Sequence, residues 1–171
     1  VRNKVLILPA SVCASDTARI IAQQVEGAVT FNNQLGCSQV ASDQQYTMDV
    51  MAGYAANPNV YGTVVVSLGC ENCQMDLVVK AIQERTNKPI EQVITQEVGG
   101  TPKAVDIGVR YAKAIVAAAS LLQKEEFPMS ELIIGTECGG SDPTSGLAAN
   151  VLIGEMSDRI VAEGGTSILS E

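Results

Sequence analysis

The sequence predicts an α/β fold: a three-layer sandwich built on a mostly parallel, Rossmann-like or flavodoxin-like sheet of about five to six strands. The main observation is that short β-branched and aliphatic runs alternate with longer segments of helical periodicity along the whole chain. The clearest short run, residues 62–68, holds consecutive β-branched residues, which is typical of a strand buried on both faces of a parallel sheet. We expect residues 1–171 to form a single α/β domain that is a fragment of a longer polypeptide.

Strands are expected where aliphatic and β-branched residues cluster between turn signals. In chain order, these clusters cover residues 4–8, 28–31, 62–68, 91–95, 132–136 and 166–169. The helices are expected between them, over about residues 15–25, 43–55, 74–85, 101–124 and 144–162. This alternation of strands and helices predicts right-handed βαβ units.

Local signals set the ends of several helices. Ser15 or Asp16 can cap the first helix through a side-chain oxygen. Thr101 is expected to cap the fourth helix, with Pro102 at its first position. The glycine pair at 164–165 is expected to end the last helix before the final strand.

The composition excludes several classes of function. The chain has a net charge of −8 and no basic run, which argues against nucleic acid or an anionic membrane surface as a partner. No apolar run approaches the roughly 18–20 residues that span a bilayer. The absence of histidine removes Ser-His-Asp triads and every histidine metal site from this chain. Five cysteines cannot all pair, so we expect free thiols and a cytoplasmic location.

Four cysteines lie just after expected strands, each followed by a turn or a helix start: Cys13, Cys37, Cys70 and Cys138. Ligands of open α/β sheets bind outside the carboxyl ends of the strands, so these thiols are expected to converge on one crevice. A lone buried cysteine is more often a small hydrophobic residue. The shared position of four of them, beside polar and glycine-rich turns, favours an active site that depends on a metal.

The segment GTECGGSDPTSG, residues 135–146, carries the densest set of reactive groups. Its acid–base or metal-ligand candidates are Glu137, Cys138 and Asp142. Its substrate-binding candidates are Gly139, Gly140 and Ser141, where the backbone can approach a carboxylate closely. The alternative is an ordinary tight turn followed by a capped helix.

Two further turns carry candidate substrate-binding groups. After the second expected strand come three consecutive amides, Asn32, Asn33 and Gln34, which can bind a polyhydroxylated substrate or satisfy the loop backbone. After the fourth come Gly99, Gly100 and Thr101, a possible anion site at a helix N-terminus. Neither turn is a nucleotide-binding fingerprint.

The pair Cys70-x-x-Cys73 lies at an expected helix start, where a thiol pKa can be lowered. It has three possible interpretations: a redox motif, half of a zinc knuckle, or a partly buried cysteine pair. No second such pair exists, and the order of elements is not thioredoxin-like. For Cys73, burial is the favoured interpretation.

These segments resemble the altronate/galactarate dehydratase family, which includes the large subunit of sulfolactate sulfo-lyase. The matching stretches span nearly the whole chain and include NPNVYG at 57–62, LGCEN at 68–72, GTECGGSD at 135–142 and GGTSILSE at 164–171. Two positions depart from the family pattern: Cys73 stands where asparagine is expected, and Val151 where proline is expected.

The resemblance implies a lyase that removes water or sulfite from a hydroxy-carboxylic acid such as altronate, galactarate or sulfolactate, with a divalent metal, iron, as cofactor. Soft thiolates from Cys37, Cys70 and Cys138 suit iron, whereas Cys73 is expected to be dispensable. Proton transfer falls to Glu71, Glu137 or Asp142, or to a residue outside this chain. The chain would be the amino-terminal part of a large subunit.

The same resemblance implies partners. A further domain should follow, a small β-rich domain or subunit should accompany it, and a homo-oligomer is left open. Two other functions also remain open: a substrate-binding or assembly module without catalysis, and a redox domain that uses Cys70 and Cys73.

Overall fold

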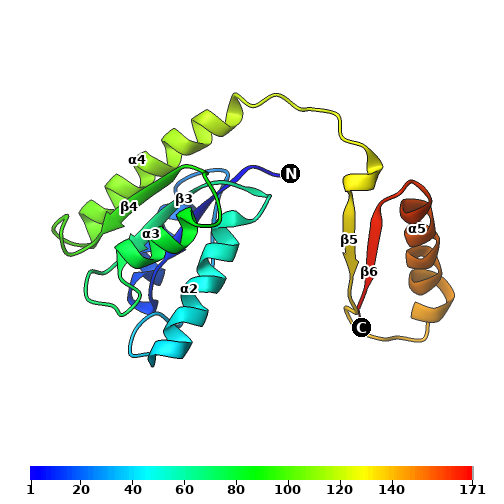
Figure 1. Cartoon of the computed structure of the whole chain (residues 1–171), viewed down its shortest axis with the longest axis horizontal. Helices are drawn as coiled ribbons and strands as arrows, with labels where there is room; N and C mark the ends of the chain where they lie inside the picture. The colour runs from blue at the N-terminus through cyan, green and yellow to red at the C-terminus, as the bar shows by residue number, and fades with distance from the viewer. Residues whose placement is uncertain (171) are drawn as a thin grey trace. The chain divides into compact units, whose positions relative to one another are not determined.

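A computed structural model describes residues 1–170. The chain forms two compact units, Val1–Leu122 and Gln123–Glu171. Each unit contains parallel strands connected through helices, as Figure 1 shows. The predicted α/β class is therefore confirmed within each unit.

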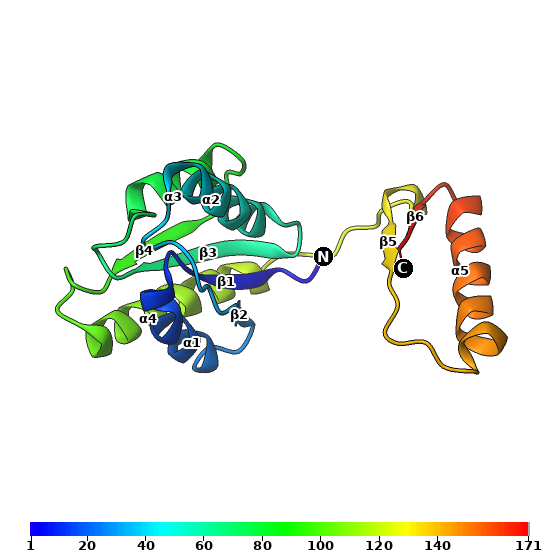
Figure 2. The same ribbon diagram turned by 90° about the horizontal axis from the view of Figure 1, so that it is seen from below.

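The first unit is a three-layer sandwich on a parallel sheet with strand order β2-β1-β3-β4. Its strands are β1 (Lys4–Pro9), β2 (Ala28–Thr30), β3 (Val60–Ser67) and β4 (Ile90–Ile94). The helices α1 (Ser15–Gln23) and α4 (Thr101–Ser120) cover one face, and α2 (Ala41–Ala56) and α3 (Met75–Gln83) cover the other, as Figure 2 shows. The observed bounds of these elements lie close to the predicted ones.

The alternation of side chains along the central strands builds the two cores of this sandwich. In β1, Val5 and Ile7 pack toward α1 and α4, whereas Leu6 and Leu8 pack toward α2 and α3. In β3, Val64 and Val65 divide between the same two cores. Because both faces are covered, apolar residues run almost without interruption along these strands.

The order of the strands creates a switch point between β1 and β3. The chain leaves β1 through α1 on one face of the sheet and leaves β3 through α3 on the other face. Connections that diverge in this way open a crevice outside the carboxyl ends of the two strands. The turns after Pro9 and Ser67 border that crevice.

The second unit contains β5 (Ile133–Thr136), a π-helical turn (Ser145–Ala149), α5 (Asn150–Ala162) and β6 (Thr166–Leu169). A 3₁₀ turn, Met129–Glu131, precedes β5, and β5 pairs with β6 in parallel. Ile160 of α5 is buried where Gly165 passes close to the helix. A Cβ atom at Gly165 would lie 2.7 Å from Cγ2 of Ile160, so the turn into β6 depends on glycine.

The number of strands in one sheet is lower than predicted. The described residues form a four-stranded sheet and a separate two-stranded sheet instead of one sheet of five to six strands. A βαβ unit can pair its two strands with each other or with an existing sheet, and strand periodicity does not distinguish these outcomes. That residues 1–171 form a single domain stays a prediction.

The start of α4 also differs from the prediction by one residue. The helix begins at Thr101, and Gly100 occupies the N-cap position with φ 109° and no side-chain cap. Glycine adopts this backbone angle without the steric cost that a Cβ would bring. None of the helices within residues 1–170 combines the length and the apolar character needed to cross a bilayer.

Candidate functional site

The turns that follow β1, β2 and β3 are joined by hydrogen bonds at the carboxyl edge of the sheet. The Asn33 side-chain amide donates to the carbonyl of Pro9 at 2.9 Å. The Val12 N–H donates to the carbonyl of Leu35, also at 2.9 Å. These bonds hold the β2 turn over the end of β1, which is one side of the switch point.

Gly36 allows the closest approach between these turns. Its φ is 91°, and a Cβ atom there would lie 2.1 Å from the carbonyl oxygen of Ala10. Its own carbonyl accepts the N–H of Cys73 at 3.0 Å, which ties the β2 turn to the β3 turn. Glycine is therefore required immediately before Cys37.

Asn72 strengthens the connection between the same two turns. Its side-chain oxygen accepts the N–H of Ser38 at 2.6 Å, and its carbonyl accepts the side-chain amide of Gln44 at 2.6 Å. No local sequence pattern predicts a role for Asn72. The only signal was its place in the LGCEN stretch, since its partners lie about thirty residues earlier.

The structure brings Cys37 and Cys70 to the same edge of the first unit. Cys37 is half-buried, Cys70 is exposed, and both are free thiols. Cys13 is also exposed, in the 3₁₀ turn Val12–Ala14 that leads into α1. These three cysteines and Cys138, which comes after β5, all follow strand ends as predicted, and their convergence on one crevice stays a prediction.

Glu71 holds the β3 turn together. Its side chain is 3% exposed, and its two carboxylate oxygens accept the N–H groups of Leu68 at 2.9 Å and Gly69 at 2.6 Å. Burial by itself would raise the pKa of Glu71. Hydrogen bonds from the Ser67 hydroxyl and from backbone N–H groups outweigh that effect and lower the pKa below its usual value.

Cys73 is fully buried beside this carboxylate. Burial raises the pKa of its thiol, and electrostatic interaction with Glu71 and Cys37 raises it further. A reactive or metal-binding cysteine needs the opposite shift, because the thiolate is the active form. The surroundings of Cys73 therefore favour a packing role over a redox role.

The three consecutive amides divide between the two roles considered for them. Asn33 is 6% exposed, and its side chain binds Pro9 and the Leu35 N–H, so it satisfies the loop backbone. Asn32 and Gln34 are exposed. Only these two keep side chains that are available to a substrate.

Backbone N–H groups in the turn after β4 form hydrogen bonds within that turn. The N–H of Gly100 donates to the Thr95 carbonyl at 2.8 Å, and that of Gly99 donates to the Gln96 carbonyl at 3.3 Å. Thr101 is exposed at the first residue of α4. The two glycine amides are therefore engaged within the turn, and substrate binding by this segment stays a prediction.

A pocket of about 370 Å³ lies between the carboxyl ends of β3 and β4. Its polar lining includes Gln74, Asp76, Gln92 and Glu97. The pocket therefore presents carboxylates and carboxamides, and no basic side chain is among its lining residues.

In the second unit, the segment after β5 lines a larger pocket of about 530 Å³. Every candidate of this segment except Asp142 lines it: Glu137, Cys138, Gly139, Gly140 and Ser141. The Cys138 sulfur lies 3.8 Å from the Ser141 hydroxyl. The pocket is thus lined by a thiol, a hydroxyl, a carboxylate and the backbone of two glycines.

Asp142 occupies the next turn, where its side chain binds locally. One carboxylate oxygen accepts both the N–H and the hydroxyl of Thr144, each at 2.6 Å. These hydrogen bonds lower the pKa of Asp142 below its usual value. This arrangement is an Asx turn, which agrees with the alternative interpretation of this segment as an ordinary tight turn.

Within residues 1–170, no three side chains of the metal-binding types converge on one point. Cys37 and Cys70 belong to the first unit and Cys138 to the second. Neither unit by itself therefore supplies a three-ligand metal centre from its described residues.

Comparison with known proteins matches both units separately. Residues 1–120 match the model of the second domain of D-galactarate dehydratase/altronate hydrolase, and residues 129–171 match the C-terminal model of D-galactarate/altronate dehydratase. No solved structure matches the chain.

Curated relatives align over the whole chain. It is 34% identical to altronate dehydratase of Bacillus subtilis (strain 168) and 32% identical to (2R)-sulfolactate sulfo-lyase subunit beta of Chromohalobacter salexigens. The chain spans 36% of the first protein and 43% of the second. A further relative, altronate dehydratase of Escherichia coli (strain K12), is 30% identical over the full chain. The chain belongs to the D-galactarate dehydratase/altronate hydrolase family.

Proposed function

We propose that this chain is part of a lyase that eliminates water or sulfite from a hydroxy-carboxylic acid. The observation that carries the proposal is the arrangement of the first unit, where the turns bearing Cys37 and Cys70 meet at a switch point of the sheet. Ligands of open α/β sheets bind at such points. The relatives named as altronate dehydratase, galactarate dehydratase and sulfolactate sulfo-lyase supply the reaction class.

Elimination requires a base for the proton next to the carboxylate, stabilisation of the enediolate that forms, and an acid for the leaving group. Glu71 is a poor base, because both of its oxygens accept hydrogen bonds from the turn. Asp142 is bound by Thr144 and its pKa is lowered. We therefore assign proton transfer to Glu137, which lines the larger pocket beside Cys138.

We also propose that Cys37, Cys70 and Cys138 hold iron. Their support is chemical: all three are free thiols that are not fully buried, and thiolates suit iron. Among the described residues, no three side chains of the metal-binding types converge on one point. A bound iron would polarise the substrate carboxylate or hydroxyl as a Lewis acid.

The test is the iron content and lyase activity of single Cys→Ala variants in the complete polypeptide, with altronate, galactarate and sulfolactate as substrates. We expect C37A, C70A and C138A each to lose iron and turnover. Cys73→Ala is the matched control and should keep its iron, because that thiol is buried. Unchanged iron in all three variants would remove the metal role.

The proposal extends to partners and location. We propose that another domain follows this chain and that a small β-rich domain or subunit accompanies it in the cytoplasm. The family model calls residues 1–120 a second domain, one relative is named as subunit beta, and the five thiols are free. A binding module without catalysis is the second candidate, favoured because Glu71 and Asp142 both accept hydrogen bonds within their own turns. Such a module would bind the hydroxy acid without turnover.

A further inference from the structure

A separate pocket of about 350 Å³ lies between the start of α1 and the end of β2. We call it the α1 pocket. It is lined by Ser15, Asp16 and Arg19 from the helix and by Thr30, Phe31 and Asn32 from the strand end. Since β2 is parallel to β1, this pocket opens at the same carboxyl edge of the sheet as the switch point.

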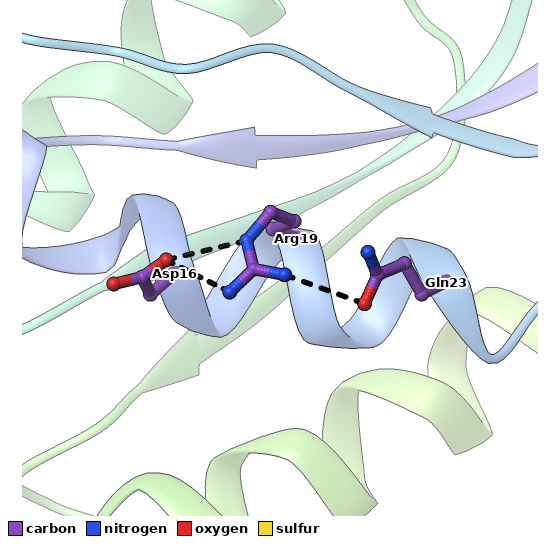
Figure 3. A network of polar contacts seen from close by, with 3 residues as sticks. All are labelled: Asp16, Arg19 and Gln23. Atoms are coloured by element: carbon purple, nitrogen blue, oxygen red, sulfur yellow. Dashed lines mark hydrogen bonds and ion pairs between the residues drawn. The ribbon is translucent and has the colours of Figure 1, made fainter.

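Arg19, which carries a positive charge, lines this pocket. Figure 3 shows its side chain lying between Asp16 and Gln23 along α1. Its Nε and Nη2 atoms donate to the same oxygen of Asp16, at 3.3 and 3.1 Å, and its Nη1 atom lies 3.5 Å from the Gln23 side-chain oxygen. A guanidinium that binds a carboxylate most strongly faces both oxygens through two parallel hydrogen bonds. Arg19 donates to only one oxygen of Asp16, so this ion pair lacks the two parallel hydrogen bonds of the strongest geometry.

The ion pair is also open to solvent. The side chains of Arg19 and Asp16 are 54% and 87% exposed. Exposed pairs of this kind contribute little, because water and salt screen them. A carboxylate that offers both oxygens can therefore replace Asp16 as the partner of Arg19.

Of the other polar side chains of the pocket, two already form hydrogen bonds within the protein and one can bind a ligand. The Ser15 hydroxyl donates to the Asn33 carbonyl at 2.8 Å, and the Thr30 hydroxyl donates to the Ile7 carbonyl at 2.7 Å. The exposed Asn32 side chain makes no hydrogen bond to any residue the structure describes. Asn32 and Arg19 thus remain to bind a ligand, beside the N-terminal end of α1, which favours a negative charge.

The charged residues in its lining distinguish this pocket from the two other pockets at the strand ends. The pocket between β3 and β4 presents Asp76 and Glu97, and the pocket of the second unit presents Glu137. In a chain of net charge −8, an incoming dianion is repelled from most of the surface. Of these three pockets, the α1 pocket alone has a basic side chain in its lining, Arg19 beside the carboxylate of Asp16, which makes it the least unfavourable of the three for a substrate carboxylate.

We propose that the α1 pocket binds a carboxylate of the hydroxy-acid substrate, with Arg19 as its ion-pair partner and Asn32 as a hydrogen-bond donor. The inference rests on the proposed function. Asp16 then acts as a competing internal ligand that the substrate displaces.

The test is equilibrium binding of galactarate to the complete polypeptide by calorimetry, with the neutral polyol galactitol and inorganic sulfate as comparison probes. We expect Arg19→Gln to weaken galactarate binding by about tenfold or more, the usual effect of losing a charge-assisted hydrogen bond. Asp16→Asn should tighten it, because the competing carboxylate is gone. Galactitol binding should not change in either variant.

Arg110→Gln is the matched control. Arg110 also forms an exposed helical ion pair, with Asp106 at 3.4 Å, but it does not line the α1 pocket. Equal weakening by R19Q and R110Q, absence of galactarate binding to the unmodified polypeptide, or sulfate binding as tight as galactarate binding would each overturn the proposal. Galactarate binding that depends on Arg19, with no turnover in the complete polypeptide, would support the pocket and contradict the lyase assignment.

Discussion

Glu71 shows how burial and hydrogen bonding decide the role of a single carboxylate. The residue lies directly after Cys70 in a motif shared with the family, which made it a candidate for proton transfer. In the structure, two backbone N–H groups of its own turn occupy its oxygens. The charge therefore stabilises the turn that presents Cys70.

Replacing Glu71 by glutamine should destabilise the chain by about 1–3 kcal/mol at neutral pH, because a charged acceptor of two N–H groups is lost. The folded-state pKa is lowered, so the stabilisation is present above the ordinary value of 4.5 and is lost as the pH falls through the folded-state value. The difference between unmodified chain and E71Q should shrink on acidification. Urea unfolding at several pH values measures it, with the exposed Glu84→Gln as control. A difference that is independent of pH would contradict this account.

The connections after β1, β2 and β3 act as one packed element at the edge of the sheet. Gly36 packs on Ala10, its carbonyl binds Cys73, and Asn72 binds Ser38. Contacts of this kind fix the positions of Cys37 and Cys70 more firmly than separate loops would. The site is therefore built on backbone contacts between turns that are distant in sequence.

Two glycine variants test this packing. Gly36→Ala and Gly100→Ala share the strain of a positive φ, 91° and 109° respectively. A Cβ at Gly36 would lie 2.1 Å from the Ala10 oxygen, whereas a Cβ at Gly100 meets nothing within 4 Å. We expect G36A to unfold more easily than G100A by about 1–3 kcal/mol, the usual cost of overpacking. Equal stability of the two variants in urea would show that the turns are not tightly packed.

At the scale of the whole molecule, two units correspond to two family models. The boundary at residues 122 and 123 lies between the matches to residues 1–120 and 129–171. Residues 122–128 have no regular secondary structure and are exposed. Of the cysteines proposed to hold iron, Cys37 and Cys70 belong to the first unit and Cys138 to the second.

Limited digestion with trypsin should cut first after Lys124, since exposed segments without regular structure are the preferred sites of proteolysis. The expected early products are residues 1–124 and 125–171, identified by mass spectrometry. Arg110 and Lys113 are exposed too, but they lie within α4 and should resist longer. Early cleavage inside α4 would contradict the division into units.

Local patterns were enough to predict most elements of the fold. The β-branched run of β3 and the glycine pair before β6 each determine a strand or a boundary through residues that are neighbours in sequence. The cysteines after β1, β2 and β3 followed from the same reasoning, because strand ends can be read from periodicity. Asn72 and Arg19 could not be found in this way, since their roles depend on partners and pockets that form only on folding.

The sequence by itself determined the α/β class and the order of strands and helices, because composition and short-range periodicity carry that information. Only the tertiary structure decided that β5 pairs with β6, that Asn33 and Glu71 hold turns together, and that Cys73 is buried. Strand pairing and burial arise from contacts between residues far apart in the chain, and no local pattern specifies them. The hydrogen-bond partners of Asn33 and Glu71 therefore became evident only in the folded chain.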